Sequence, residues 1–286
     1  MQKIISGKAI AENLIEKELI PRVGKLRKKN IIPKLVVILI GDNPASASYV
    51  RQKEIFAKKV NILSEVKKFD KNISEQKILS EIKKLNNDDS VHGIIVQLPV
   101  PEHISVKKIL YTIDPKKDVD GFTPINLGKL FLNEKTLVCC TPKGIIRMLE
   151  ESGENLQGKK ITIVGRSNVV GKPVALLALN KNATVKICHS KTKNLSAELQ
   201  DAEILIVAVG SPEFLAGKDI PKNSVVIDVG IHRKNNGKLC GDIKFDEAIK
   251  KVKKISPVPG GVGPMTVFSL IENVIEAAEN KYLACL

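Results

Sequence analysis

The chain has 286 residues, 43% hydrophobic and 27% charged, which is ordinary for a globular protein with one large or two modest domains. Its longest apolar run, at 35–40, is far shorter than the roughly 20 residues that a membrane-spanning helix needs, and its charged beginning lacks the apolar core of a secretory signal. A formal net charge of +15 is typical of some nucleic-acid-binding proteins, but the lysines recur in pairs on the polar sides of amphipathic segments and only 3% of residues are aromatic.

Cysteine and histidine usage predicts reduced thiols and no metal site. The number of cysteines is odd and their spacing is not that of a zinc or redox motif, so a cytoplasmic location is expected. The four histidines are scattered and form no HExxH pattern. The cysteines are Cys139, Cys140, Cys188, Cys240 and Cys285.

In the first half of the chain, helical and extended patterns alternate, which predicts parallel α/β architecture. An amphipathic helix is expected at 8–29, bent near Pro21. The apolar run at 35–41 predicts a buried strand, and Asn43 and Pro44 after it are typical of a helix cap and first turn. After a polar connection we expect a helix at 74–86, a strand at 92–99 and a helix opened by a Thr-Pro pair at 140–151.

The second half has a more regular pattern, and 141–263 is interpreted as one nucleotide-binding unit. A closing helix at 265–281 follows the loop PVPGGVGPMT. Within the unit we expect strands at 161–165, 184–188, 204–209 and 225–229, and helices at 171–181 and 243–252.

A glycine-rich turn, ITIVGRSNVVGKP, joins the first of these strands to a helix. Such a turn brings backbone amides close to phosphate, although a purely structural strand–helix turn explains the glycines equally. An NAD site places an acidic residue after the second strand, but here no Asp or Glu occurs between Glu154 and Glu198. Arg166 and Ser190 instead suit the 2′-phosphate of NADP, the alternative being that Arg166 is an exposed loop residue.

A lysine lies on the apolar side of the helix that begins near Pro44. Lys53 within this arc suits acid–base chemistry, and the alternative is a lysine whose stem packs on the core while its head reaches water. Gln97 at a strand end and Asp120 near the domain crossing add polar groups, although Asp118 and Asp120 are also typical of a turn. The arc comprises Tyr49, Val50, Lys53, Phe56, Ala57 and Val60.

Seven segments match one known family and occur in the family's order. They are YVRQK (49–53), GIIVQLPVP (93–101), DPKKDVDGF (114–122), CTPKG (140–144), VGRSNVVGKP (164–173), VVIDVGI (225–231) and PVPGGVGPMT (257–266). The chain therefore resembles the bifunctional methylenetetrahydrofolate dehydrogenase/cyclohydrolase family over almost its whole length.

The resemblance implies a two-domain α/β fold, with a Rossmann-like NADP-binding domain at 141–263 and a catalytic folate domain at 1–140 and 264–286. The implied active site lies in the cleft between the domains. The implied reactions of one-carbon metabolism are NADP-dependent oxidation of 5,10-methylenetetrahydrofolate and hydrolysis of the 5,10-methenyl product to 10-formyltetrahydrofolate, which serves purine biosynthesis. The family usually forms cytoplasmic homodimers through the nucleotide-binding domain.

The resemblance also implies roles for individual residues. Tyr49 would stack on the folate, Lys53 would be the central acid–base residue, and Gln97 would hold Lys53 near the reacting carbon. Asp120 would accept hydrogen bonds from the pterin ring. The remaining implied substrate residues are Val96, Leu98, Pro259, Gly260, Gly261, Val262 and Gly263, and the implied NADP residues are Gly165, Arg166, Ser167, Gly171, Ser190 and Ile231.

Three other functions remain compatible with parts of the sequence. A monofunctional NAD(P)-dependent dehydrogenase of a related small substrate would retain both domains but lose one activity. An NADP-dependent oxidoreductase of an unrelated substrate would not need Tyr49, Lys53, Gln97 and Asp120 together. A nucleic-acid binder would rest on net charge alone and would show steeply salt-dependent binding to a generic duplex. Neither nucleic acid nor membrane is an expected partner.

Overall fold

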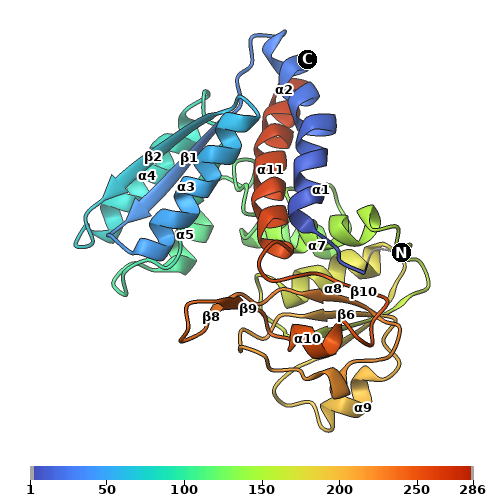
Figure 1. The fold of residues 1–286 in the computed structure, drawn as a ribbon. Coiled ribbons are helices and arrows are strands. Elements are labelled where there is room, and N and C mark those ends of the chain that lie inside the picture. Colours follow the sequence, from blue (N-terminus) through green and yellow to red (C-terminus); the bar gives the residue numbers. More distant parts are fainter. Residues whose placement is uncertain (1–2, 285–286) are drawn as a thin grey trace. The chain divides into compact units, whose positions relative to one another are not determined.

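The computed structural model describes residues 3–284 and divides the chain into two compact units (Figure 1). Of the described residues, 13–140 and 267–284 form the three-stranded unit, and 3–12 and 141–266 form the five-stranded unit. Each unit has its own parallel sheet. No helix within residues 3–284 is long and apolar enough to cross a membrane.

The sheet of the three-stranded unit places β1 (Lys34–Ile40) between β2 (Leu63–Phe69) and β3 (Gly93–Val96), with all strands parallel. Six of the seven β1 residues are buried, as expected for a central strand covered on both faces. The carboxyl ends of β1 and β3 therefore meet at one edge of the sheet, where the chain continues from β3 into Gln97. Helix α3 (Pro44–Lys59) contacts both β1 and β2.

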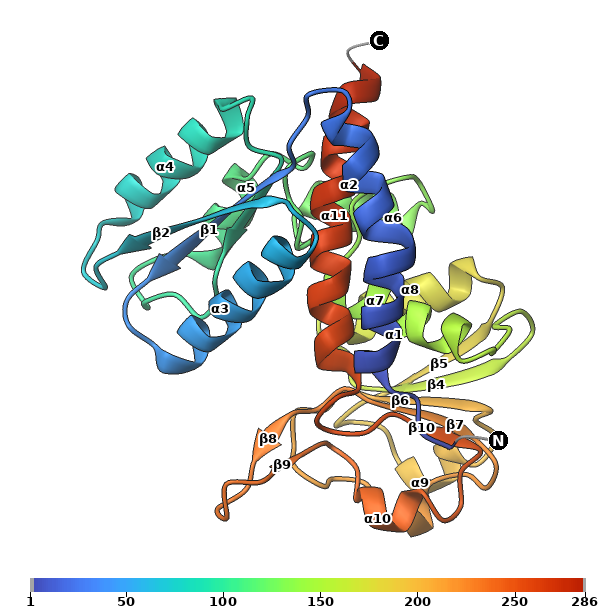
Figure 2. The ribbon, with the colours of Figure 1, turned by 45° about the horizontal axis from the view of Figure 1, so that its top comes forward.

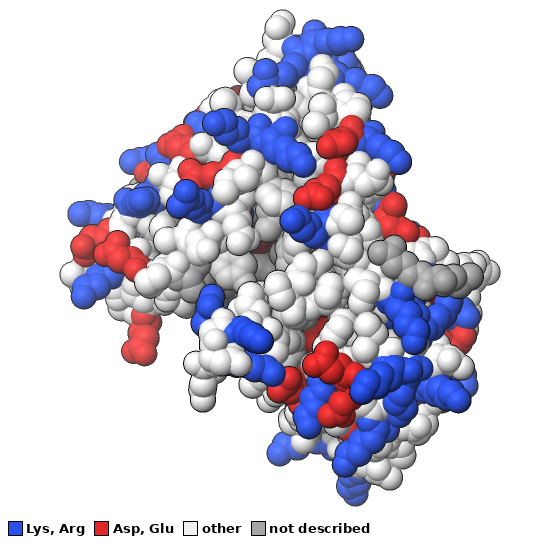
Figure 3. All heavy atoms as spheres, viewed as in Figure 1, with Lys and Arg blue, Asp and Glu red and all other residues white. Residues whose placement is uncertain are grey.

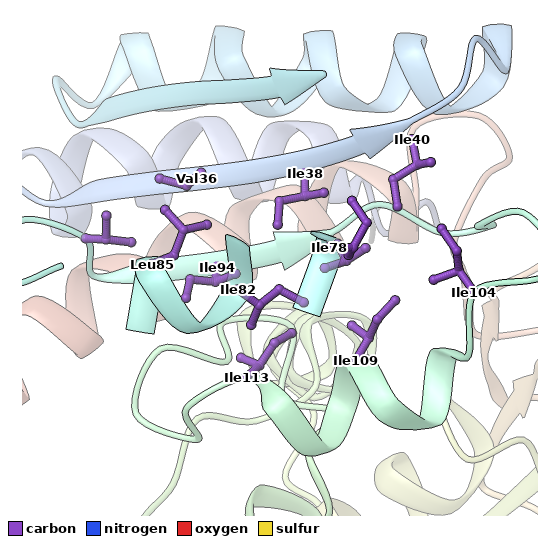
Figure 4. Close-up of a cluster of buried hydrophobic side chains, with 12 residues drawn as sticks. Val36, Ile38, Ile40, Ile78, Ile82, Leu85, Ile94, Ile104, Ile109 and Ile113 are labelled. Carbon is purple, nitrogen blue, oxygen red and sulfur yellow. The ribbon is translucent and has the colours of Figure 1, made fainter. Parts of the chain in front are cut away.

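One face of this sheet packs on α4 (Glu75–Asn87) and α5 (Val106–Thr112), and Figure 4 shows their side chains converging on it. Alternate residues of a strand point to the same face, so β1 contributes every second side chain. Ser74 and Ser105 accept backbone hydrogen bonds that begin the two helices. The cluster contains Val36, Ile38, Ile40, Ile78, Ile82, Leu85, Val91, Ile94, Val96, Ile104, Ile109 and Ile113.

The predicted helix at 8–29 is present as three consecutive segments. These are α1 (Gly7–Leu14), a π-helical turn η1 (Ile15–Leu19) and α2 (Ile20–Arg27). The predicted irregularity near Pro21 is this wide turn, which immediately precedes α2; proline has no N–H to continue the normal ladder. Alongside α2 runs the long closing helix α11 (Val262–Ala284), as Figure 2 shows, and the Arg22 guanidinium pairs with Glu279 at 2.7 Å.

The sheet of the five-stranded unit is parallel throughout, in the order β10-β7-β6-β4-β5. The chain passes from β4 outward to β5 and then returns to β6 on the other side of β4, which creates a topological switch point between β4 and β6. The strands are β4 (Lys160–Val164), β5 (Thr184–Cys188), β6 (Ile204–Val207), β7 (Val225–Asp228) and β10 (Lys254–Ile255). The longer helices of this unit are α7 (Cys140–Glu151) and α8 (Gly171–Asn180). Its shorter helical segments are α9 (Leu195–Leu199), the 3-10 turn η2 (Gly217–Asp219) and α10 (Phe245–Ala248). The remaining helix, α6 (Pro124–Phe131), belongs to the three-stranded unit.

The predicted strands of both sheets are present, but two element predictions need correction. The polar connection before residue 74 contains β2, an edge strand in which polar and apolar residues alternate. The helix predicted at 243–252 is confined to α10, whereas the helix predicted at 140–151 is present as α7 with the Thr-Pro pair in its first turn. A two-stranded antiparallel hairpin, β8 (His232–Arg233) and β9 (Leu239–Cys240), has no counterpart in the prediction.

Residues 3–12 also differ from the predicted domain division, which assigned 1–140 to the catalytic domain. They belong to the five-stranded unit because Ile4 forms a parallel bridge with Ile255 of β10. The Ile5 amide donates to the Ile255 carbonyl at 2.9 Å, and the Lys8 amide donates to the Gly260 carbonyl at 3.0 Å. The pairing with Ile255 extends the edge of the sheet at β10.

Candidate active site

Lys53 and Gln97 form a direct pair in the three-stranded unit. Lys53 Nζ, on α3, donates to Gln97 Oε1 at 2.9 Å. The backbone amide of Gln97 donates to the Ile38 carbonyl at 2.9 Å, which continues the pairing of β3 with β1 for one residue. Gln97 Nε2 donates to the Leu98 carbonyl at 2.8 Å, so the amide oxygen is the atom that faces the lysine. The half-buried Lys53 head is therefore held by a neutral acceptor at the end of a strand.

The remaining residues of the predicted apolar arc of α3 divide by burial. Val50, Ala57 and Val60 are buried, and Phe56 is half-buried. Tyr49 lies on the same arc but is less buried than its neighbours there, with 45% of its surface exposed. An exposed phenol ring one turn before Lys53 is suited to stacking against a flat ligand.

The two aspartates of KDVDGF have different environments. Asp118 is buried, and its carboxylate accepts hydrogen bonds from the amides of Gly121 (3.0 Å) and Thr123 (2.7 Å) and from Asn126 Nδ2 (2.9 Å). Asp118 is therefore the residue that builds the turn, as one of the two sequence interpretations expects. Asp120 keeps part of its surface exposed and lies 3.9 Å from Cys140 Sγ.

Asp120 and Lys53 influence each other electrostatically. Burial raises the pKa of Asp120 above its ordinary value, and the positive charge of Lys53 opposes this rise. The negative charge of Asp118 adds to the rise. The hydrogen-bonded pair Lys53–Gln97 and the carboxylate of Asp120 thus belong to one polar site within the three-stranded unit.

The peptide before Asp120 is held by a residue with no predicted role. Asn273 of α11 is fully buried, and its Nδ2 donates to the carbonyls of Val119 and Val138, both at 2.8 Å. Cys140 Sγ donates to the same Val119 carbonyl at 3.1 Å. The sequence signal is an asparagine among the mostly apolar residues of the closing helix.

The other predicted substrate residues lie in two segments. Val96 is buried at the end of β3 and Leu98 is 38% exposed, both in the three-stranded unit. The predicted closing loop, Pro259–Gly263, belongs to the five-stranded unit, where an added Cβ at Gly261 would collide with the Pro257 carbonyl. The peptide bonds Leu98–Pro99 and Val258–Pro259 are cis. The predicted substrate residues are thus divided between the units.

The glycine turn lies at the carboxyl end of β4, beside the switch point. Gly165 has φ +129°, and a Cβ there would collide with the Ala208 carbonyl oxygen; a Cβ at Gly171 would collide with the Gly165 carbonyl oxygen. Ser167 Oγ accepts the amides of Val170 (3.1 Å) and Gly171 (3.4 Å) at the start of α8. The bare backbone forms a cradle of the kind that dinucleotide pyrophosphates occupy.

The neighbouring side chains fit NADP at this cradle. Arg166 is exposed after Gly165, and Ser190 is exposed after β5. The Gly165 amide donates to the Cys188 carbonyl at 2.9 Å, which ties the glycine turn to the end of β5. The segment that follows β5 carries Lys191 and no carboxylate before Glu198, so a 2′-phosphate would meet positive and hydroxyl groups. Beyond β7, Ile231 is 49% exposed.

Two models of one protein family match this chain. The tetrahydrofolate dehydrogenase/cyclohydrolase catalytic-domain model matches residues 5–120, and the NAD(P)-binding-domain model of the same family matches residues 139–282. A bifunctional protein FolD from Bacillus subtilis is 48% identical over 276 residues, which cover 96% of this chain and 97% of the relative.

Two solved structures have the same fold along nearly their whole length. The bifunctional FolD methylenetetrahydrofolate dehydrogenase/cyclohydrolase of Campylobacter jejuni has a TM-score of 0.95 at 44% identity, covering 97% of this chain and 99% of its own. The methylenetetrahydrofolate dehydrogenase-cyclohydrolase (FolD) of Trypanosoma brucei, complexed with NADP cofactor and an inhibitor, has a TM-score of 0.91 at 34% identity and covers 98% of each chain. The chain therefore belongs to the tetrahydrofolate dehydrogenase/cyclohydrolase family.

Proposed function

We propose that this chain oxidises 5,10-methylenetetrahydrofolate with NADP and hydrolyses the 5,10-methenyl product to 10-formyltetrahydrofolate. The observation that carries this proposal is the pair Lys53–Gln97 beside Asp120 in one unit, together with the glycine cradle and Arg166 in the other. Family membership over nearly the whole chain supports the same pair of reactions.

For the oxidation, the residues of the chain act by positioning. Tyr49 stacks on the pterin ring, and the Asp120 carboxylate accepts hydrogen bonds from its N–H groups. Bound NADP supplies the hydride acceptor. A hydride leaves the methylene carbon, and the folate becomes the methenyl cation without any proton transfer at that carbon. Holding the two reacting carbons at near-attack distance is therefore the main requirement on the protein.

For the hydrolysis, the lysine carries the chemistry. Water adds to the methenyl carbon, the bond from that carbon to N5 breaks, and the water oxygen becomes the formyl oxygen on N10 while one proton is released. Lys53 assists the attack and the proton transfers that follow it. Gln97 accepts the Lys53 hydrogen bond and so directs the nitrogen toward the reacting carbon.

The test is an anaerobic assay with 5,10-methylenetetrahydrofolate that compares NADP with NAD and follows both methenyl and reduced nicotinamide. NADP-preferring turnover, with methenyl decaying faster than in buffer, is expected. Methenyl that decays only at the buffer rate would leave a monofunctional dehydrogenase. Equal use of NAD would contradict the role of Arg166, and absence of turnover with either cofactor would contradict the function.

The basic surface does not favour the nucleic-acid alternative. On the face shown in Figure 3, lysine and arginine side chains lie at many separate places and are interspersed with acidic side chains. Several lysines are paired, including Lys186 with Asp201 at 3.0 Å and Lys67 with Glu81 at 2.8 Å. Binding of a generic duplex with a steep salt dependence would support that alternative.

We also propose that the protein is a cytoplasmic homodimer whose 10-formyl product supplies purine biosynthesis. The four cysteines in the described residues are buried free thiols, which suits a reducing compartment. In the five-stranded unit, β5 is an edge strand with Ile187 40% exposed, and we assign the contact between copies to this unit. Light scattering after size-exclusion chromatography tests the dimer; a monomeric mass at micromolar concentration would exclude it.

A further inference from the structure

A buried carboxylate contacts the segments that follow β6 and β7 in the five-stranded unit. Asp242 has no exposed surface, and its carboxylate accepts hydrogen bonds from three consecutive amides that follow β6. These donors are Val209 (2.7 Å), Gly210 (3.2 Å) and Ser211 (3.0 Å). Three amides converging on one carboxylate fix the course of this loop.

The same carboxylate reaches the segment after β7. His232 Nε2 lies 2.8 Å from Asp242 Oδ1, and a Cβ at Gly230 would collide with that oxygen. Ile231, a predicted NADP residue, is thus flanked on both sides by residues in contact with Asp242. One side chain therefore sets the positions of the loops that follow β6 and β7.

A second buried carboxylate, Asp228, holds Asp242 in place. Asp228 accepts the backbone amides of Asp242 (2.9 Å), Ile243 (3.0 Å) and Gly230 (3.2 Å). A Cβ at Gly241 would collide with the Asp228 carboxylate, so a glycine is required next to Asp242. The two carboxylates and two glycines form an interlocked cluster.

The loop fixed by Asp242 borders the glycine turn. The Ala208 amide donates to the Val164 carbonyl at 2.8 Å, and the space beside Gly165 is limited by the Ala208 carbonyl. These contacts lie at the switch point between β4 and β6, where open parallel sheets bind their ligands.

We propose that Asp242 is a positioning residue for NADP, holding the 209–211 loop and Ile231 in the arrangement that the cofactor binds. This inference rests on the proposed binding roles of Gly165 and Ile231. Asp242 acts through the backbone that it orders, since its own carboxylate is fully buried. A preordered loop removes a cost of ordering from cofactor binding.

The test compares Asp242→Asn with Glu154→Gln. Asparagine keeps the size of the side chain but presents an N–H group to amides that need an acceptor. Glu154 is a buried carboxylate of the same unit, bound by Lys253 and Lys254, near the amino ends of β6 and β7. Three quantities are measured: hydrogen exchange of amides 209–211 in the cofactor-free protein, the Kd for NADP by titration, and the KM values for NADP and folate.

For Asp242→Asn we expect faster exchange at 209–211, a rise of about tenfold or more in the Kd and KM for NADP, and less than a twofold change in the folate KM. Glu154→Gln should leave the exchange and the Kd unchanged. An unchanged Kd in Asp242→Asn, or an equal rise in Glu154→Gln, would overturn the proposal. Failure of the wild-type protein to bind NADP would instead overturn the proposed function.

Two variants of His232 test the same proposal if Asp242→Asn does not fold, because they change a single contact of Asp242. His232→Leu removes only the contact on the Ile231 side, and we expect a several-fold rise in the Kd for NADP without faster exchange at 209–211. His232→Gln restores an N–H donor and should recover most of the affinity. Equal affinity in wild type and His232→Leu would contradict the role of this contact.

Discussion

At the scale of single residues, Lys53 is a cation held by a neutral amide at 2.9 Å. Lys53→Met keeps the stem and removes the ammonium, so we expect the cyclohydrolase rate to fall at least about a hundredfold, in the range usual for loss of an acid–base group. Hydrolysis of 5,10-methenyltetrahydrofolate, followed by its absorbance above the buffer rate, measures the effect. Lys58→Met, an exposed lysine on the same helix, is the control. A Lys53→Met rate within twofold of wild type would exclude this role.

Arg166 gives a separate prediction about the cofactor. Its side chain is exposed beside the glycine cradle, and Arg166→Ala would remove the proposed charge-assisted bond to the 2′-phosphate. We expect the KM for NADP to rise about tenfold or more while the KM for NAD changes little. Steady-state kinetics with both cofactors measures the ratio. A parallel rise for both cofactors would mean that Arg166 does not discriminate between them.

The positions of candidate site residues were predictable from the sequence where they follow a local pattern. Their environments were not predictable where these depend on residues far away in the chain. The helical position of Lys53 and the strand-end position of Gln97 follow from periodicity, and both are present. The different environments of Asp118 and Asp120 depend on which carboxylate meets the amides of the turn, and local composition allowed either. The position of Asn273 beside Val119 depends on a contact across 154 residues.

At the scale of elements, α11 supports the Asp120 segment through one side chain. Asn273→Leu is similar in size but leaves the carbonyls of Val119 and Val138 without this donor, so we expect a loss of about 2 kcal/mol or more in the free energy of unfolding. We also expect a higher KM for folate, because the peptide before Asp120 is released. Urea unfolding and steady-state kinetics measure the two effects.

Ser269 provides the matched control on the same helix. It is fully buried, and within the described residues its hydroxyl has no hydrogen-bond partner. Ser269→Ala should therefore be neutral or stabilising. If Asn273→Leu and Ser269→Ala changed the folate KM equally, the effect would belong to the packing of α11 rather than to the asparagine.

Element prediction succeeded for strongly apolar segments and failed for weakly apolar ones. β1 and β6 are continuous apolar runs at the centres of their sheets. β2 carries charged residues because it is an edge strand, so its sequence LSEVKKF is also typical of a connection. The helix predicted at 243–252 ends at Ala248, and five residues then lead to β10, which begins at Lys254.

At the scale of the whole molecule, the buried Asp228 predicts a pH dependence of stability. Burial raises the pKa of Asp228 from 3.8 to about 7, despite the amides that donate to it. Between these two values the folded state keeps a proton that the unfolded chain has lost, so stability falls as pH rises, by up to about 1.4 kcal/mol per pH unit, and the loss is complete above the folded pKa.

Asp228→Asn remains neutral at every pH and removes this contribution. We therefore expect the unfolding free energy of the variant, minus that of wild type, to increase from pH 5 to about 7 and then to level off. Taking the difference between variant and wild type cancels the contribution of titrating groups that the substitution does not affect. Asp242 and His232 belong to the same cluster, so double variants that also change one of these residues serve as controls. Urea unfolding at unit pH intervals measures the difference. A constant difference across this range would contradict the prediction.

The two-unit α/β fold was predictable because alternating strands and helices recur along the chain. The unit to which the N-terminal segment belongs was not predictable. The bridge between Ile4 and Ile255 joins residues at opposite ends of the sequence. No local pattern specifies such a pair, since a short apolar segment fits many sheet edges.

The divisions between the two units fall inside helices rather than in loops. Glu12 lies within α1, Cys140 is the first residue of α7, and Thr266 lies in the first turns of α11. A protein fragment that ended at these positions would have interrupted helices, with backbone amides and carbonyls that lack their hydrogen-bond partners. Neither unit is therefore an exchangeable module: moving one to another protein by recombination would require three helical junctions to be matched at once, in phase as well as in length.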